Sequence, residues 1–105
     1  MQSQSIVVKL GGSMTQSKEA LLGLSAEIAA LSSAARVAVV HGGGGDVSAL
    51  SRRLGIEPSF TDGVRNTTEA EMDLVDMVLC GLVNKRIVRL FGKWGLPAVG
   101  ISGAD

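Results

Sequence analysis

This sequence has a single cysteine and no excess of positive charge. Cys80 is the one cysteine, so no internal disulfide can form and a metal cluster is not expected. Ten basic residues balance ten acidic ones, which argues against nucleic-acid binding. No apolar run approaches the ~18 residues that span a membrane, and Met1–Ser5 is polar rather than a signal-peptide core. We therefore expect a cytoplasmic protein with neither nucleic-acid nor membrane partners.

Small aliphatic residues supply most of the apolar content. Hydrophobic residues make up 46% of the 105 positions, but aromatic residues only 3%. This composition fits one layered α/β domain that is long enough to bury a core. Cys80 falls in an apolar helical pattern, and we interpret it as a small buried hydrophobic residue.

A glycine-rich stretch organises the rest of the chain. Val37–Val40 predicts a strand buried on both faces, and His41 and Gly42–Gly45 follow it before the start of a helix. Glycines let a backbone approach an anion closely, and a helix N-terminus favours negative charge. The alternative is that the glycines only permit a tight turn and close packing. Neither GxxxxGK[ST] nor a GxGxxG followed by a suitably spaced acidic residue is present, so the pattern alone leaves the ligand open.

A βαβ unit is predicted in the first part of the chain. Ile6–Leu10 is an apolar strand closed by Gly11–Ser13, and Ser17–Leu31 has the apolar spacing of an amphipathic helix before the Val37–Val40 strand. Strands joined in this way are parallel, so both glycine turns should lie at one edge of the sheet. A further buried strand is predicted at Pro97–Gly103.

Lys9 stands near the end of the first predicted strand, directly before the glycine turn. Burying an unpaired ammonium group is costly, so Lys9 either extends into solvent or meets the negative charge of a ligand. The carboxyl edge of a parallel sheet is where open α/β folds bind ligands. This position favours a catalytic or binding lysine.

A short helix and a small hairpin follow the second glycine turn. The apolar pattern of Val47–Leu54 predicts a helix that ends at Gly55. Within Ile56–Arg65, the turn signal Thr61–Gly63 predicts a two-stranded flap. Arg65, at its end, could pair with a surface carboxylate or grip the carboxylate of a ligand.

The next helix is predicted over residues 68–91, which is long compared with the mean of about 12 residues. Two capping boxes are possible at its start, Asn66 with Glu69 and Thr68 with Glu71. Its apolar surface exceeds the single stripe of a surface helix. Part of it should therefore pack on another subunit or on a second core layer.

Together these motifs resemble the N-terminal half of the N-acetylglutamate kinase branch of the amino acid kinase (carbamate kinase-like) superfamily. The motifs that carry the resemblance are Val8–Ser13, Val40–Gly44, Thr61–Arg65, Val83–Lys85 and Ala98–Gly103. The resemblance implies an α/β fold, a three-layer αβα sandwich with a mainly parallel sheet, of which residues 1–105 form the N-terminal substrate-binding and dimerisation portion.

The resemblance also implies a role for individual residues. Lys9 would stabilise charge on the phosphoryl group during transfer, and the backbone of Gly11 and Gly12 would contact that phosphoryl group. The amides of Gly43 and Gly44 would bind the γ-carboxylate of the acid, and Arg65 its other carboxylate. His41 would only orient the glycine loop.

The implied activity is ATP-dependent phosphorylation of N-acetyl-L-glutamate in arginine biosynthesis, with ATP and Mg²⁺ bound mainly by a C-terminal half that is absent from this chain. We therefore expect residues 1–105 alone to be inactive. The implied assembly is an arginine-insensitive homodimer built across helix 68–91, because the first strand begins near residue 5 and leaves no room for an N-terminal helix.

Two points stay open. Asp46 adds negative charge near the predicted anion site, which would weaken binding unless its carboxylate caps the helix. The substrate could instead be N-acetylaminoadipate or a carrier-protein-linked acid, and a non-catalytic module that binds acidic metabolites is the alternative from another class.

Overall fold

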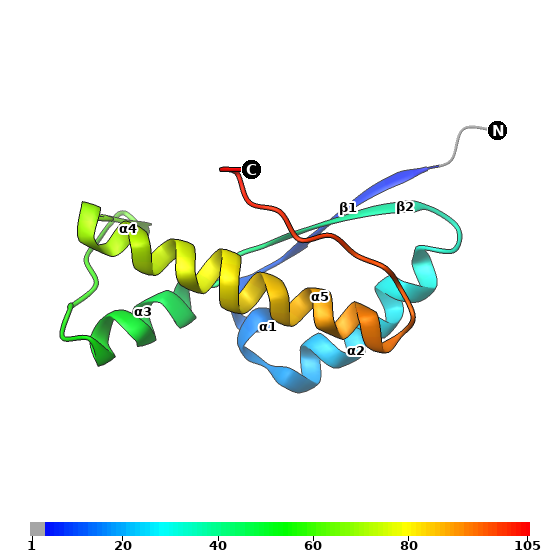
Figure 1. The fold of residues 1–105 in the computed structure, drawn as a ribbon, viewed down its shortest axis with the longest axis horizontal. Coiled ribbons are helices and arrows are strands. Elements are labelled where there is room, and N and C mark those ends of the chain that lie inside the picture. The colour runs from blue at the N-terminus through cyan, green and yellow to red at the C-terminus, as the bar shows by residue number, and fades with distance from the viewer. Residues whose placement is uncertain (1–3) are drawn as a thin grey trace.

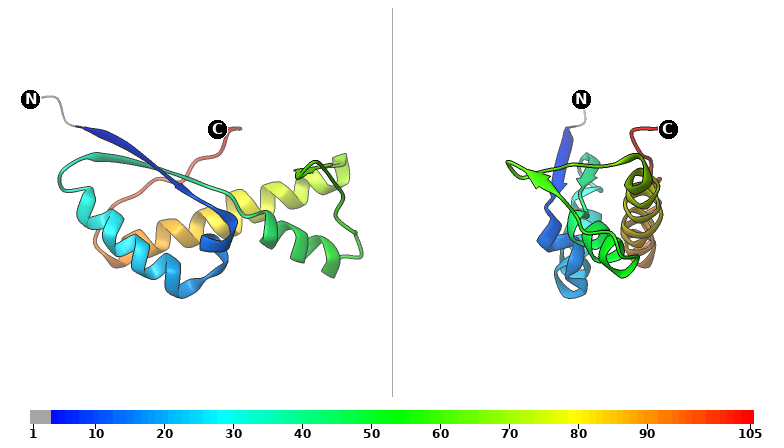
Figure 2. Two further views of the ribbon diagram at one scale, coloured as in Figure 1. Left: turned by 180° about the vertical axis from the view of Figure 1, so that it is seen from behind. Right: turned by 90° about the vertical axis from the view of Figure 1, so that its left-hand side faces the viewer.

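The computed structural model describes residues 4–105, so the expectation for Met1–Ser5 lies partly outside the described residues. The molecule measures 50 × 27 × 24 Å along its principal axes. A pair of long strands crosses helices that gather on one side, and a continuous helical rod runs along most of the length (Figures 1 and 2). No helix within residues 4–105 is long and apolar enough to cross a bilayer.

The predicted βαβ unit is confirmed. Strand β1 (Ser5–Leu10) pairs in parallel with β2 (Arg36–His41), and the connection between them runs through α1 (Gly12–Gln16) and α2 (Lys18–Leu31). The Ser17 hydroxyl accepts a hydrogen bond from an amide in the first turn of α2, which fixes where that helix begins. The short helix α1 was not predicted, because five residues carry too little apolar periodicity to reveal a helix.

The α/β class with a parallel sheet is confirmed, but the predicted burial of β2 on both faces is wrong for the described residues. Val7 and Val40 lie on the uncovered face and are 70% and 52% exposed. The helices pack on the other face only, so the strands alternate between covered and exposed side chains. The residues of the sheet that join or pack against the core cluster are Val8, Leu10, Val37 and Val39.

The predicted short helix and flap are also confirmed. Helix α3 (Gly44–Arg53) ends just before Gly55, whose positive φ of 78° suits a helix terminus. Strands β3 (Phe60–Thr61) and β4 (Val64–Arg65) form an antiparallel hairpin. Between the two strands lie Asp62 and Gly63, whose φ angles of 50° and 77° match the tight turn that this sequence pattern favours.

The predicted long helix is a continuous rod with a π-helical segment that the sequence did not reveal. It comprises α4 (Glu69–Val75), the π-helical segment η1 (Asp76–Val83) and α5 (Asn84–Lys93). Its inward-facing side chains complete the core, and they include Val78, Val83, Ile87 and Phe91. Cys80 on η1 is half-buried rather than fully buried. π-Helical turns widen a helix locally, and apolar spacing alone does not distinguish them from α-helical turns.

The predicted strand at Pro97–Gly103 is wrong. This segment is irregular, and Val99 and Ile101 are 89% and 71% exposed. A hollow of about 1230 Å³ separates it from β2, so it has no neighbouring strand with which to pair. Side chains of α5 hold it instead, because Lys85 donates to the Gly100 carbonyl at 3.1 Å.

Only one of the two possible capping boxes forms, that of Thr68 and Glu71. The Glu71 amide donates to the Thr68 hydroxyl at 3.2 Å, and the Glu71 carboxylate accepts from the Thr68 amide at 3.0 Å. The Thr68 hydroxyl also donates to this carboxylate, at 2.9 Å. The hydrogen bonds that the carboxylate accepts from the Thr68 amide and then from its hydroxyl lower the pKa of Glu71 below its usual 4.5; burial acts in the opposite direction, and the charge of Arg65 lowers the pKa further.

We predict that Thr68→Ala reduces the free energy of unfolding by about 1 kcal/mol, because the first turn of α4 loses its cap. Since the folded-state pKa of Glu71 is depressed, the stabilisation from its carboxylate is present above pH 4.5 and lost as the pH falls through the folded-state value. Glu71→Gln should therefore flatten this acid dependence in urea denaturation measured from pH 7 to pH 3.

Thr67→Ala is the matched control, since the neighbouring threonine is exposed and makes no cap hydrogen bond in the described part of the chain. Equal losses in Thr67→Ala and Thr68→Ala would contradict the assignment of the cap.

Candidate functional site

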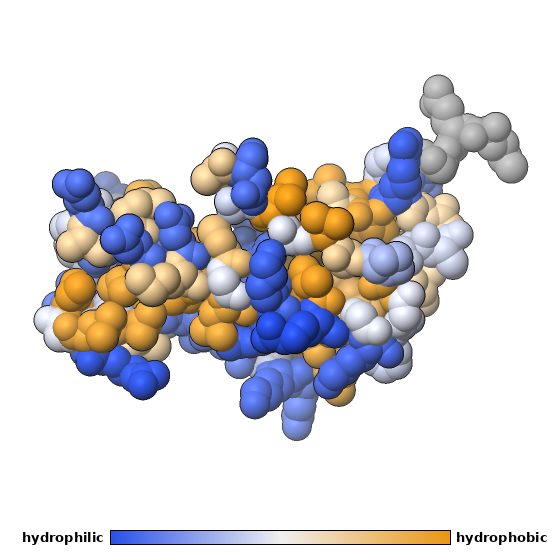
Figure 3. Space-filling view, in the orientation of Figure 1, coloured by the Kyte–Doolittle hydropathy of each residue, from blue (hydrophilic) through white to orange (hydrophobic). Residues whose placement is uncertain are grey.

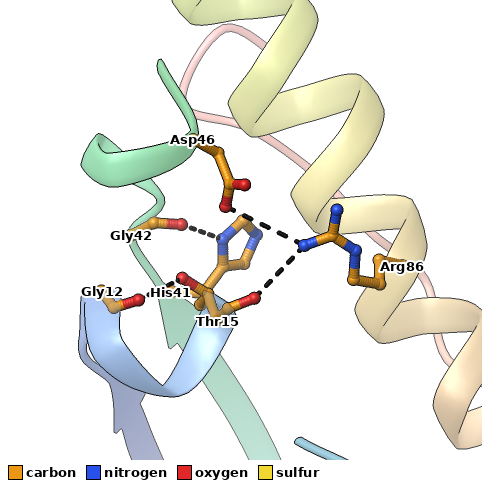
Figure 4. A network of polar contacts seen from close by, with 6 residues as sticks. All are labelled: Gly12, Thr15, His41, Gly42, Asp46 and Arg86. Carbon is orange, nitrogen blue, oxygen red and sulfur yellow. Dashed lines mark hydrogen bonds and ion pairs between the residues drawn. The ribbon is translucent and has the colours of Figure 1, made fainter. Parts of the chain in front are cut away.

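The two glycine turns meet at one edge of the sheet, as predicted. Leu10 and His41 are register partners at the ends of the parallel strands, and the Gly42 amide donates to the Leu10 carbonyl at 3.3 Å. The turn after β1 and the turn after β2 therefore begin side by side. Helices α1 and α3, which start in these turns, also contact each other (Figure 4).

Lys9 lies at this same edge, one residue before the end of β1. Its register partner is Val40, so its side chain lies on the uncovered face of the sheet and is exposed. Lys9 therefore carries no cost of burying an unpaired ammonium group. Lys9 makes no ion pair within residues 4–105, which leaves its charge available to a ligand.

The first glycine turn has no internal packing reason to be glycine. A Cβ atom added to Gly11 or Gly12 would meet no atom within 4 Å. Gly11 has an extended backbone, and no side chain caps the first turn of α1 that follows it. The backbone of this turn is therefore open to a ligand.

The second glycine turn combines the two roles that the sequence left open. Gly43 has a φ of 150°, and an added Cβ would come within 2.7 Å of Leu79 in η1, so close packing requires glycine there. Gly44 differs, because its added Cβ would make only an ordinary contact of 3.7 Å with Arg65. No side chain within residues 4–105 caps α3 at this end, so the amides of its first turn lack a side-chain acceptor there.

His41 orients the second turn through two hydrogen bonds. Its Nε2 lies 3.1 Å from the side-chain amide nitrogen of Asn84, and its Nδ1 lies 2.9 Å from the Gly42 carbonyl. Because the Asn84 amide can only donate, Nε2 accepts and Nδ1 donates. Asn84 is 8% exposed. Its place in the Val83–Lys85 motif is the only signal in the sequence that points to this role.

Arg65 is held against the second glycine turn rather than in a surface ion pair. Its Nη2 donates to the Gly44 carbonyl and to the Ser48 hydroxyl, both at 2.8 Å. The guanidinium carbon also lies 4.8 Å from the centre of the Phe60 ring in the flap, a cation–π distance. Nη1 is shielded from solvent and has no hydrogen-bond acceptor among the described residues. The guanidinium group is therefore fixed through Nη2, and Nη1 keeps an unused donor among the described residues.

Asp46 does not cap α3. Its Oδ2 lies 3.9 Å from Nη1 of Arg86, which also donates to the Thr15 carbonyl at 3.2 Å (Figure 4). The role of Arg86 was not predicted from the sequence, because nothing in its local pattern on the rod indicates that it reaches two other helices.

Two other features of the described chain bear on where the site lies. Residues 4–105 contain no group of three or more His, Cys, Asp or Glu side chains that could hold a metal ion. The hollow between β2, the rod and the C-terminal segment is lined in part by His41 and Asn84, but not by Lys9, Arg65 or the glycines of the two turns. The candidate site is therefore the edge formed by Lys9, the two glycine turns and Arg65.

Comparisons with known proteins identify relatives of this chain. The chain is 40% identical over 103 residues to an acetylglutamate kinase of Bacillus cytotoxicus, covering 98% of this chain and 40% of that protein. This chain thus spans about 40% of the length of its curated relative.

Solved structures show the same fold. The crystal structure of the smu.665 protein of Streptococcus mutans UA159 matches with a TM-score of 0.72 and 26% identity, over 90% of this chain and 38% of that one. N-acetylglutamate synthase of Neisseria gonorrhoeae, complexed with coenzyme A and N-acetyl-glutamate, matches with a TM-score of 0.75 and 23% identity, over 94% of this chain and 23% of that one. The second likeness supports the fold alone.

A family model confirms the resemblance found in the sequence motifs. The model of the amino acid kinase family matches residues 4–105, which is nearly the entire sequence. This chain belongs to the amino acid kinase family.

Proposed function

We propose that the protein containing this chain is an acetylglutamate kinase, which transfers a phosphoryl group from ATP to the γ-carboxylate of N-acetyl-L-glutamate in arginine biosynthesis. The observation that carries the proposal is the position of Arg65, fixed to Gly44 and Ser48 beside the uncapped start of α3. The 40% identity to an acetylglutamate kinase supports it. The cytoplasmic location expected from the sequence stays a prediction.

The two carboxylates of the acid need two positive sites, and this edge offers both. We assign one carboxylate to the guanidinium of Arg65, whose Nη1 has no acceptor in the described structure. We assign the reacting γ-carboxylate to the amides of Gly43 and Gly44. Because Arg65 is bonded to Gly44, the two sites are held at a fixed separation. Such positioning is what the transfer reaction demands of the protein.

The phosphoryl side of the site falls to Lys9 with Gly11 and Gly12. An exposed ammonium group at the edge of the sheet and an open glycine backbone fit the charge and bulk of a phosphoryl group. Transfer to a carboxylate needs charge neutralisation and alignment, and no covalent protein nucleophile. ATP with Mg²⁺ supplies the phosphoryl group.

We propose that the main nucleotide site lies in the part of the relatives' length that this chain does not match. Phosphorylation by residues 1–105 alone is accordingly not expected.

We predict that the whole protein, assayed with MgATP, forms an acyl phosphate from N-acetyl-L-glutamate, trapped by hydroxylamine and matched by ADP release. The expected kcat/KM exceeds that for N-acetyl-L-aminoadipate by about tenfold or more, which corresponds to about 1.4 kcal/mol of discrimination. A higher kcat/KM for aminoadipate would contradict the substrate assignment, and no phosphorylation of any acid would contradict the proposed activity.

We predict that Lys9→Ala and Arg65→Ala separate the two halves of the site. Lys9→Ala should lower kcat by about 100-fold or more with little change in the KM for the acid, because its charge is needed chiefly during transfer. Arg65→Ala should raise the KM for the acid by about 10- to 100-fold, since a charge-assisted hydrogen bond to the carboxylate is lost.

Arg53→Ala is the control for this pair, because Arg53 is exposed at the opposite end of α3. The opposite division of kcat and KM effects would show that the two roles are misplaced.

We also propose a homodimer that forms through residues 68–91. Large apolar side chains stay exposed along the rod, with Met72, Met77 and Leu82 at 46%, 59% and 45%. Figure 3 shows apolar patches on one face of the molecule, interrupted by hydrophilic side chains. A helix surface that one chain leaves uncovered in this way is suited to a partner subunit.

We predict a dimer in sedimentation velocity and a shift toward monomer in Met77→Asp, because a charge would be buried at the interface. Leu54→Asp, at the equally exposed Leu54 outside the rod, should leave the dimer intact. A wild-type hexamer or monomer would contradict this assembly.

A further inference from the structure

Arg86 joins the two glycine turns from the rod. Its Nη1 donates at 3.2 Å to the Thr15 carbonyl in α1, the helix that starts at Gly12. The same nitrogen lies 3.9 Å from Oδ2 of Asp46, in the first turn of α3, the helix that starts at Gly44. Figure 4 shows the guanidinium pointing from the rod toward both helices.

Asp46 needs this partner. Its Oδ2 is shielded from solvent and accepts no hydrogen bond among residues 4–105. The side chains of Arg86 and Asp46 are only 29% and 21% exposed, so water screens their charges weakly. Without Arg86, a poorly solvated negative charge would remain in the first helical turn, two residues from the amide of Gly44. An acid that binds there would be repelled.

The hydrogen bonds of Thr15 add a second function to the pair of Arg86 and Asp46. The Thr15 hydroxyl donates at 2.9 Å to the Gly12 carbonyl, so the end of α1 is tied to its glycine start. Arg86 therefore fixes α1 through the Thr15 carbonyl and α3 through Asp46. One side chain sets the spacing between the turn assigned to the phosphoryl group and the turn assigned to the acid.

We propose that Arg86 is a positioning residue of the acid site, which cancels the charge of Asp46 beside the second glycine turn and holds the two turns in register. This inference rests on the proposed function, because it takes the start of α3 as the binding place of a carboxylate. Because Arg86 cancels its charge, Asp46 is compatible with an anion site although it does not cap α3.

The proposal predicts non-additive effects on acid binding. Arg86→Gln leaves Asp46 uncompensated, so the KM for N-acetyl-L-glutamate should rise by about tenfold or more. Asp46→Asn removes a negative charge near the site, so that KM should fall by about twofold. The double variant Asp46→Asn/Arg86→Gln should return to within about threefold of the wild-type KM, because the uncompensated charge is gone, and the remaining increase measures the lost contact between the two turns.

The test is steady-state kinetics of the whole protein and its variants, with thermal unfolding recorded for each. Arg52→Gln is the matched control, because it breaks the exposed ion pair of Arg52 with Glu57 at 3.6 Å and should not change the KM. If Arg86 had a merely structural role, its effect on the KM would add to that of Asp46→Asn in the double variant. A double variant with a KM as high as that of Arg86→Gln would therefore overturn the proposal.

Loss of folding in Arg86→Gln does not remove the test. If Arg86→Gln fails to fold, the proposal requires that the double variant folds and binds the acid with a KM near the wild-type value. Failure of the double variant as well would overturn the pairing.

A second measurement separates this inference from the proposed function. Should the wild-type protein phosphorylate none of the acids, the proposed function fails, and amide hydrogen exchange then tests the register of the turns. Arg86→Gln should accelerate exchange in peptides covering residues 11–17 and 42–48. Arg52→Gln should leave exchange in both peptides unchanged. Unchanged exchange in both peptides of Arg86→Gln would overturn the positioning role.

Discussion

The parallel pairing of β1 with β2 is the constraint on which the rest of the structure depends. Its register runs from Ser5 with Arg36 to Leu10 with His41, so both strands end at the same level. Each strand is followed by glycines, and two turns that lie far apart in the sequence thereby become neighbours. A shift of the register by one residue would move Lys9 to the covered face and separate it from the edge.

The rod from Glu69 to Lys93 fixes the positions of the two neighbouring turns. Its π-helical segment lies so close to Gly43 that no side chain fits between them. Asn84 sets the tautomer and orientation of His41, and Arg86 reaches both α1 and α3. The capping box that starts the rod also places the carboxylate of Glu71 near Arg65. Packing and polar contacts from one helix therefore position the two glycine turns.

Local patterns predicted the elements that depend on local physics. The βαβ unit, the flap with its Asp62 and Gly63 turn, and the long helix follow from apolar spacing and turn chemistry, and the structure confirms them. The position of Lys9 at the sheet edge followed from the handedness and order of a βαβ unit. The motifs identified the family, which the family model confirms.

Long-range contacts account for what the sequence did not reveal. Pro97–Gly103 has the composition of a strand, but a strand needs a hydrogen-bonding neighbour, and α5 side chains take that place. Whether a face of the sheet is exposed depends on which helices pack on it. The β-branched residues of the strands do not specify this. Arg86 and Asn84 act across 71 and 43 residues of sequence, respectively, so their roles do not follow from local apolar spacing.

The central claim is that the two glycine turns form a single site for an acidic substrate. An amide NMR titration of the isotopically labelled whole protein with N-acetyl-L-glutamate tests it most directly. The account predicts saturable shifts of the Gly43, Gly44 and Arg65 amides, with smaller shifts at Gly12. Shifts confined to the hollow beside the C-terminal segment, with the glycine amides unmoved at saturation, would contradict it.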